Sequence, residues 1–242
     1  MTAAPLDLLA IVAHPDDAEL ICGGTLIRAA DAGHRTGVLD LTGGEAGTAG
    51  NAARREEEST RASGFLGLAT RRVAGLPDGA LENSPDARNR VAAILRELRP
   101  GTVILMWPEA RHPDHRVASQ LAYDACFVAG LTKAPIPGDR FRPRKVLYAM
   151  AYREHTPKPT FVVDISDQMD RKLDAIYAYG SQFEGKKGMG EVYPAGDRDL
   201  RDQLLAHHAY YGGLIRTAYG EPFWTRETMA VDDVVALDVA SF

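Results

Sequence analysis

Short apolar runs alternate with helix-like segments along this chain, and this alternation constrains the fold more than any other feature. The predicted strands are apolar runs, at 6–13, 35–42, 71–76, 102–108, 145–152 and 160–166. The predicted helices have helical spacing or stop signals, at 23–33, 54–67, 85–100, 114–130, after a cap at Ser166, and at 198–218. The pattern predicts an α/β, Rossmann-like fold, a mostly parallel sheet with helices on both faces.

The length and composition predict one domain. The chain has 242 residues, of which 45% are hydrophobic and 25% are charged, ordinary values for a globular protein with one core. We expect a single domain over 1–242, with the core at 6–166 and C-terminal helices at 167–242. The Gly-rich segment 181–197 lacks periodicity, so we expect a mobile loop over about 184–197.

Charge and cysteine content exclude several classes of partner. The net charge of −5 offers no basic surface for nucleic acid or an anionic membrane, so small molecules or proteins are the expected partners. Runs such as LLAIVA are far shorter than the roughly 20 residues of a membrane helix. The N-terminus lacks a signal-peptide pattern, which predicts a cytoplasmic protein. Cys22 and Cys126 belong to no CxxC motif and are interpreted as small core residues.

Two acidic turns that contain histidine follow two of the predicted strands. The segment HPDD (14–17) begins where the first strand ends, and RHPDHR (111–116) follows the strand at 102–108. In an open parallel sheet, ligands bind at the carboxyl ends of the strands. We therefore expect the two turns to meet at one edge of the sheet, although about 100 residues separate them.

The residue types in these turns suit a metal ion. Imidazole nitrogens and carboxylate oxygens bind Zn²⁺, and a catalytic zinc site uses three protein ligands. His14 and Asp17 are close enough to share an ion, and either His112 or His115 is a candidate third ligand. Asp16 is then placed to act as a general base. The alternative is that each turn is a proline turn with a capping aspartate, Asp16 included.

The chain resembles a known enzyme family in these motifs. AHPDDAEL with RHPDHR is similar to the zinc-dependent N-acetylglucosaminylphosphatidylinositol de-N-acetylases, or LmbE-like deacetylases. Further similar stretches follow in the family's order, namely GEAGTAGN (44–51), RREEESTRASGFLGL (54–68), GLPDGAL (75–81), RPRKVLYAM (142–150), FVVDIS (161–166) and YGSQF (179–183). The resemblance implies a hydrolase that removes acetate from an amino-sugar conjugate, and it implies homo-oligomers, often hexamers.

The resemblance also assigns roles to individual residues. It makes His14, Asp17 and His115 the metal ligands, with Zn²⁺ as the ion or Fe²⁺ in the cell. Asp16 becomes the general base. His112 faces the developing oxyanion or the leaving amine, and Asp114 orients its ring.

Substrate-binding residues follow from the same resemblance. The chain is most similar to the deacetylases of bacillithiol biosynthesis that act on N-acetylglucosaminyl malate. A guanidinium suits a malate carboxylate, which predicts Arg55, in a pair with Glu58, and Arg111 as substrate-binding residues. Arg54 is the alternative to Arg55, one position earlier.

Several alternatives stay open. Within the same class, the chain is a candidate amidase for a thiol conjugate or a deacetylase for another glucosamine derivative. From other classes come a receiver-like signalling module, which has no use for HPDH, and a binding protein without activity. The sequence departs from the family pattern at Ala49, in 184–197 and in HHAYYGG (207–213), regions that bear on the substrate.

Overall fold

One seven-stranded sheet organises the protein. The computed structural model describes residues 4–47, 52–150, 157–185 and 198–239. The strand order is β3-β2-β1-β4-β5-β7-β6. The strands are β1 (Leu8–Val12), β2 (Thr36–Asp40), β3 (Thr70–Val73), β4 (Thr102–Leu105), β5 (Lys145–Ala149), β6 (Phe161–Asp164) and β7 (Gly220–Trp224). Strands β1 to β5 pair in parallel, and β7 pairs antiparallel with both β5 and β6.

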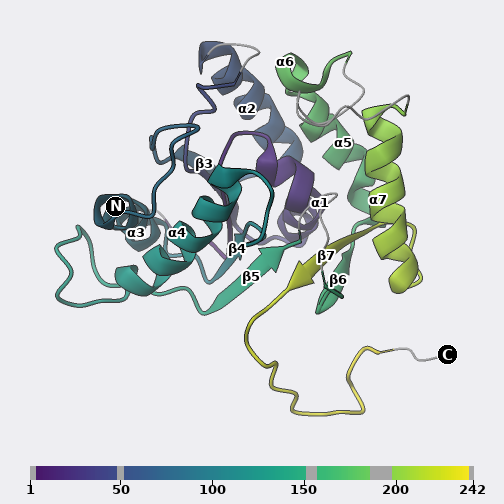
Figure 1. Ribbon diagram of the computed structural model, residues 1–242. Coiled ribbons are helices and arrows are strands. Elements are labelled where there is room, and N and C mark those ends of the chain that lie inside the picture. The colour runs from purple at the N-terminus through teal and green to yellow at the C-terminus, as the bar shows by residue number, and fades with distance from the viewer. Residues whose placement is uncertain (1–3, 48–51, 151–156, 186–197, 240–242) are drawn as a thin grey trace.

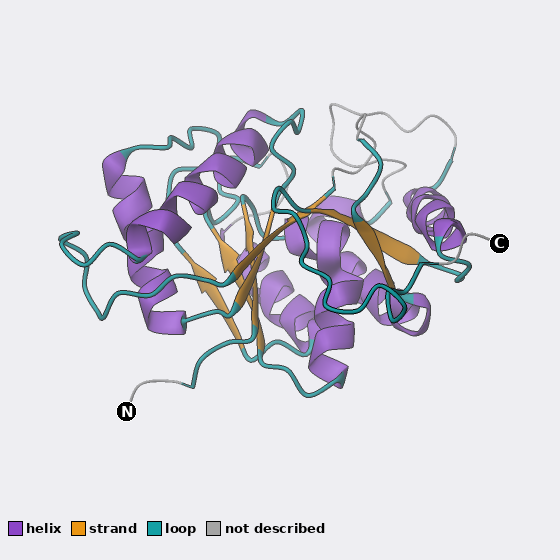
Figure 2. Cartoon of the chain, turned by 90° about the horizontal axis from the view of Figure 1, so that it is seen from below, coloured by secondary structure: helices purple, strands orange, loops and turns teal. Residues whose placement is uncertain are grey.

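Helices cover both faces of this sheet, as Figures 1 and 2 show. The helices are α1 (Asp17–Asp31), α2 (Ala52–Leu66), α3 (Pro85–Leu98), α4 (Pro113–Ala129), the short η1 (Ser166–Gln168), α5 (Met169–Tyr177), α6 (Gly180–Phe183) and α7 (Leu200–Leu214). Helices α3 and α4 pack together on one face, and α1, α2 and α5 pack together on the other. The predicted α/β, Rossmann-like class is confirmed.

Strand register brings the two histidine turns together. All five residues of β1 are buried, as the apolar run predicts. Leu8 pairs with Thr102 and Ile11 with Leu105, so β1 and β4 run side by side and end at the same edge. The turns that follow them, at 14–17 and 112–115, therefore emerge as neighbours.

Helix α1 begins six residues before the predicted start. It starts at Asp17 and contains a kink at Cys22, whose φ of −148° is not helical. The predicted start at Gly23 marks the second half of this kinked helix. Gly24 is required there because a Cβ at this position would lie 2.8 Å from Cγ2 of Ile165.

The prediction that Ser166 caps the helix after β6 is wrong. Ser166 begins the short helix η1, and α5 starts only at Met169. The Ser166 hydroxyl instead donates to Oδ1 of Asp164 over 2.6 Å. The Asp164 carboxylate thus binds the hydroxyl that was expected to accept a backbone N–H at the start of α5.

Strand β7 was not predicted. Gly220 and Pro222 read as turn signals, and proline is rare inside a sheet because it lacks an N–H. Pro222 nevertheless lies between two strands, where its carbonyl accepts from the N–H of Met150. An interior strand accepts proline only at a position where the sheet needs no backbone N–H donor. Local sequence does not reveal which positions these are.

The remaining predictions are met with shorter bounds or fall outside the described residues. The predicted strand over 71–76 ends at Val73, and the helix over 198–218 spans Leu200–Leu214. Cys22 and Cys126 are free and buried, as expected for core residues. Most of the predicted 184–197 loop and Ala49 lie outside the described residues. No helix within the described part of the chain has the length and apolar character to cross a bilayer.

Candidate metal centre

The HPDD turn presents its side chains at the end of β1. The N–H of His14 donates to Oδ2 of Asp17 over 2.8 Å, which closes the turn. Between them Asp16 adopts a left-handed conformation with φ of 111°, uncommon for a residue with a side chain. This backbone lets α1 begin directly at Asp17, beside the last residues of β1.

His14, Asp17 and His115 form a compact group of metal-binding atoms. Nδ1 of His14 lies 3.2 Å from Oδ2 of Asp17, and Nε2 of His115 lies 3.2 Å from Oδ1 of the same carboxylate. The donor atoms of all three residues lie within 4.8 Å of one another. Two imidazoles and one carboxylate are a donor set typical of catalytic zinc.

A second group, formed by His14, His112 and Asp114, satisfies the same distance criterion. Its carboxylate is already engaged, because Oδ2 of Asp114 accepts from the N–H of Gly79 over 2.7 Å and Oδ1 accepts from Leu81 over 3.4 Å. Asp17 also accepts one backbone N–H, from His14, but the group around it is the better candidate because its carboxylate directs one oxygen to each histidine.

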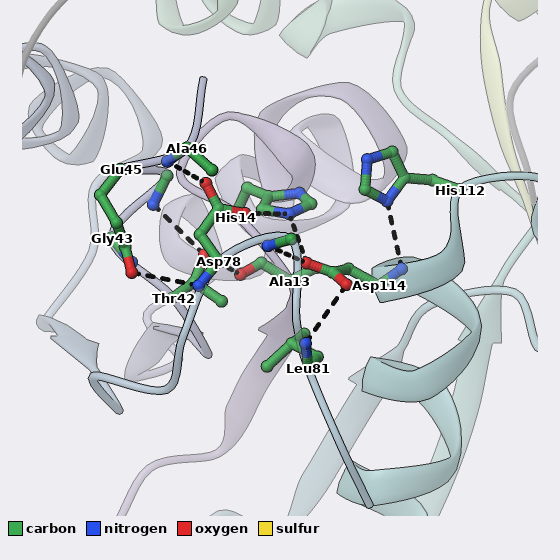
Figure 3. A network of polar contacts seen from close by, with 12 residues as sticks. Ala13, His14, Thr42, Gly43, Glu45, Ala46, Asp78, Leu81, His112 and Asp114 are labelled. Atoms are coloured by element: carbon green, nitrogen blue, oxygen red, sulfur yellow. Dashed lines mark hydrogen bonds and ion pairs between the residues drawn. The ribbon is translucent and has the colours of Figure 1, made fainter. Parts of the chain in front are cut away.

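Asp78 completes the surroundings of His14 and was not predicted from the sequence. Figure 3 shows Asp78 and Asp114 beside the His14 ring, and Oδ1 of Asp78 lies 3.0 Å from its Nε2. Oδ2 of Asp78 accepts from the N–H of Ala46 over 2.8 Å. A carboxylate on the second ring nitrogen orients a metal-binding histidine. The signal was present: GLPDGAL follows β3, so a third acidic turn reaches this edge.

The carboxylates make this corner strongly favourable for positive charge. Burial by itself would lower the pKa of His14, but Asp17 and Asp78 outweigh it and raise the pKa to about 11. Burial likewise opposes ionisation of Asp17, yet His115 and His14 hold the pKa of Asp17 well below its usual range. The donor set therefore fits a cation held between His14, Asp17 and His115.

Asp16 differs from the adjacent Asp17 in the direction in which its pKa is shifted. Its side chain makes no hydrogen bond to the start of α1, so the capping interpretation of Asp16 is wrong. Burial, together with the Asp17 carboxylate, raises the pKa of Asp16 to about 7. A buried carboxyl group poised near neutrality is suited to proton transfer.

His112 caps helix α4. Its Nδ1 accepts the N–H of Asp114 over 3.2 Å, so the proton of the neutral ring belongs on Nε2. Burial, with His115 and His14 nearby, lowers the pKa of His112. The predicted orientation of this ring by the Asp114 carboxylate is not what the structure shows. That carboxylate faces His14 at 3.4 Å, and the Asp114 backbone contacts His112.

Comparison with known proteins places this site in a family. The family model described as "PIG-L: GlcNAc-PI de-N-acetylase" matches residues 9–126, which include both histidine turns. The diacetylchitobiose deacetylase of Thermococcus kodakarensis is 34% identical, over 88% of this chain and 80% of its own. The chain belongs to the PIG-L family. It is therefore a hydrolase of a de-N-acetylase family.

Two further relatives support membership of the PIG-L family. A probable N-acetyl-alpha-D-glucosaminyl L-malate deacetylase 2 from Bacillus anthracis is 30% identical, over 74% of this chain and 82% of the relative. The crystal structure of the conserved protein TT1542 from Thermus thermophilus is 41% identical, with a TM-score of 0.84. The match covers 94% of this chain and 98% of that chain.

The side chains that the PIG-L resemblance marks for substrate binding lie in different surroundings. Arg55 is buried, and its Nη1 donates to the carbonyl of Pro15 over 2.7 Å and to Oδ2 of Asp16 over 3.3 Å. Arg111 is exposed, and its carbonyl accepts from Nη1 of Arg116 over 2.7 Å.

Glu58 is fully buried and is engaged within the protein. Its Oε1 accepts from the N–H of Ser181 over 2.8 Å, and its Oε2 accepts from the hydroxyl of Ser181 over 2.6 Å. Nε of Arg54 donates to Oε1 over 3.2 Å. Glu58 thus joins α2 to the start of α6.

Proposed function

We propose that this protein is a zinc-dependent deacetylase that hydrolyses the acetamide of an N-acetylglucosamine derivative. One observation carries the proposal: two histidines and Asp17 converge, and a second carboxylate, Asp16, lies beside them with its pKa near neutrality. The relatives named as deacetylases of N-acetylglucosamine derivatives support the reaction class.

His14, Asp17 and His115 would hold the ion, with Asp78 and Asp114 fixing the His14 ring. A zinc ion bound there supplies Lewis-acid polarisation of the acetamide carbonyl and acidifies water. Fe²⁺ suits the same nitrogen and oxygen donors, so both metals enter the test.

Asp16 and His112 would do the proton chemistry. Asp16 is held by Arg55 and is proposed to accept the proton of the attacking water. His112 carries its proton on Nε2, because Nδ1 is taken by the helix N-terminus. Its Nε2–H is proposed to donate a hydrogen bond to the developing oxyanion, and the proton that Asp16 takes from water is proposed to pass to the leaving amine.

Arg55 and Arg111 remain the proposed substrate-facing cations. Nη1 of Arg55 contacts the Pro15 carbonyl and Asp16, and this place beside the proposed general base supports its role. Glu58 was predicted as a third substrate residue, but its oxygens are occupied by Ser181 and Arg54. We propose that it acts indirectly, by fixing the position of α2 and of Arg55.

Two relatives suggest different substrates. The 34% identical relative is named for diacetylchitobiose and the 30% identical one for N-acetylglucosaminyl malate. We propose an N-acetylglucosamine derivative of this kind, with diacetylchitobiose as the first substrate to test. The malate conjugate of bacillithiol biosynthesis is the second.

Acetate release tests the proposal. The protein is loaded with zinc, loaded with Fe²⁺, or stripped with a chelator, and is offered diacetylchitobiose, N-acetylglucosaminyl malate and a cysteinyl-glucosamine conjugate. We expect metal-dependent acetate release from one of the first two, and its loss in Asp16→Asn. Cleavage of the cysteinyl amide alone would instead indicate a conjugate amidase. No hydrolysis of any of them with zinc or Fe²⁺ bound would contradict the proposal.

A further inference from the structure

A cavity lies at the amino ends of three parallel strands, at the edge of the sheet opposite the candidate metal centre. Its volume is about 430 Å³, which is within the range of small-molecule sites. Its walls come from the starts of β1, β4 and β5 and from the end of α1. Leu8 begins β1 and His14 follows its end, so about 20 Å of extended chain separates the cavity from the His14 ring. A molecule in this cavity is therefore separate from the reacting acetamide.

Strand register places three residues of the cavity wall in one row. Leu8 pairs with Thr102, and Thr102 pairs with Lys145. Residues that are paired in this way on parallel strands direct their side chains to the same face of the sheet. Ala29 of α1 and His34, which follows α1, also line the cavity. The row therefore presents an apolar group, a hydroxyl and a cation side by side.

The backbone groups beside the cavity are already paired with one another. The carbonyl of Gly101 accepts from the N–H groups of Arg144 and Lys145, over 2.9 Å and 3.3 Å. The N–H of Thr102 donates to the carbonyl of Asp7 over 3.0 Å. These bonds fix the backbone of the two cationic residues at the cavity wall. Recognition of a ligand is therefore left to the side chains.

The segment RFRPRK (140–145) gives this edge of the sheet a concentration of positive charge. The guanidinium groups of Arg140 and Arg142 donate to oxygen atoms of the protein. Arg144 and Lys145 are exposed and line the cavity, and no carboxylate in the described part of the chain forms an ion pair with either of them. Two adjacent cations of this kind suit a phosphate group, whose oxygens accept hydrogen bonds from guanidinium and ammonium alike.

The one carboxylate of the cavity wall is partly satisfied within the protein. Oδ2 of Asp7 accepts from the N–H of Arg35 over 2.8 Å and lies 3.8 Å from Nδ1 of His34. No described residue donates to its Oδ1, so this oxygen can accept a hydrogen bond from a hydroxyl group of a ligand. The Thr102 hydroxyl can both donate and accept. The cavity thus combines two cations with groups that suit hydroxyls.

These side chains together define a ligand class. A phosphate would bind to Arg144 and Lys145, while Asp7 and Thr102 would meet hydroxyl groups and Leu8 would contact the carbon skeleton. A phosphorylated monosaccharide has all three features and suits a cavity of about 430 Å³. We propose that this cavity is a binding site for a sugar phosphate, separate from the site of deacetylation.

Calorimetric titration of the zinc-loaded, full-length protein with glucose 6-phosphate tests the proposal. This probe has no acetamide, so its binding is measured without turnover and does not depend on the proposed deacetylase activity. We expect one site, with inorganic phosphate and glucose each bound at least about tenfold more weakly, because each meets only part of the cavity wall. Arg144→Gln with Lys145→Gln should weaken glucose 6-phosphate binding by about 100-fold. Lys158→Gln with Arg201→Gln makes the same charge change at exposed residues elsewhere and should leave the affinity unchanged.

Two single variants locate the bound molecule. Thr102→Val keeps the shape of the side chain and should weaken glucose 6-phosphate binding by about tenfold, with inorganic phosphate unaffected. The metal centre is the competing site for phosphate, and Asp17→Ala should retain glucose 6-phosphate binding. Loss of binding in Asp17→Ala, with none in the variant of Arg144 and Lys145, would place the phosphate on the metal and overturn the proposal. No binding, equal affinity for inorganic phosphate, or equal weakening by the control variant would overturn it too.

Discussion

Of the buried polar clusters along helix α1, the one at its start and the one at its kink differ in how their charge is balanced. At its start, Asp16, Asp17, Asp78 and Asp114 gather around His14, with Arg55 as the permanent cation in contact. At its kink, Lys172 and Glu221 form a fully buried pair, with Nζ to Oε1 at 2.5 Å. The first cluster needs a further cation, whereas the second is complete within the chain.

The complete cluster explains the kink. Glu221 accepts from the N–H groups of Gly24 and Thr25 over 2.8 Å and 2.7 Å, and Lys172 donates to the carbonyl of Leu20 over 2.7 Å. The broken helix at Cys22 exposes these backbone groups, and the ion pair satisfies them. A carboxylate at a helix N-terminus also meets the favourable end of the helix dipole. The comparison predicts that the first cluster governs chemistry and the second governs stability.

The largest expected effect is at the shared carboxylate of the first cluster. Asp17→Ala removes the one group that faces both His14 and His115, so stoichiometric zinc should be lost. Deacetylase activity should fall by about 10³-fold or more, because the metal contributes several kcal/mol to catalysis. Metal analysis by mass spectrometry with an acetate assay measures both. Asp7→Ala, at the other end of β1, is the control and should change neither.

Asp16→Asn separates binding from catalysis within the first cluster. The amide keeps the shape of the side chain but cannot accept a proton from water. We expect zinc content to be retained while kcat falls by about 10²- to 10⁴-fold. Loss of zinc in parallel with activity would show that Asp16 holds the metal instead, and would remove the difference between the two neighbouring aspartates.

Glu221→Gln should destabilise the fold without changing metal content. Lys172 would be left buried without its counter-ion, which costs about 3–5 kcal/mol. Urea unfolding of the zinc-free protein measures the loss, and Glu227→Gln, at an exposed residue, is the control. Lys172→Met combined with Glu221→Gln should recover part of the stability, because no buried charge remains unpaired. A larger loss in the double variant would contradict the ion-pair explanation.

The smallest effect concerns His208, which lies beside the second cluster. Burial, then the charges of Lys172 and His207, hold the pKa of His208 well below its usual value. Below about pH 6.5 the unfolded state binds a proton that the folded state does not, so stability falls as pH falls, by up to about 1.4 kcal/mol per pH unit.

Replacing His208 with Gln should therefore flatten the dependence of unfolding free energy on pH below about 6.5, whatever its effect at higher pH. His34→Gln, at an exposed histidine, is the matched control and should keep the original slope. An unchanged slope in the His208 variant would show that its protonation is not linked to unfolding.

The sequence by itself determined the α/β class and the placement of the histidine turns. Both follow from local rules: apolar runs make buried strands, and parallel strands deliver their following turns to one edge. That rule predicted His14 and Asp17 together with either His112 or His115, the family resemblance selected His115, and the structure brings the donor atoms of His14, Asp17 and His115 together. The family resemblance added the separate role of Asp16, which remains a proposal.

Only the tertiary structure decided which distant side chains meet. Glu221 contacts Gly24 across 197 positions and Lys172 across 49, and no local pattern specifies such pairs. Asp114 faces His14 instead of His112 because its position in the first turn of α4 directs it toward the end of β1. Strand β7 exists because β5 and β6 supply partners that its own Gly and Pro do not predict. Local sequence sets the elements, whereas packing selects the contacts among many that the same sequence would allow.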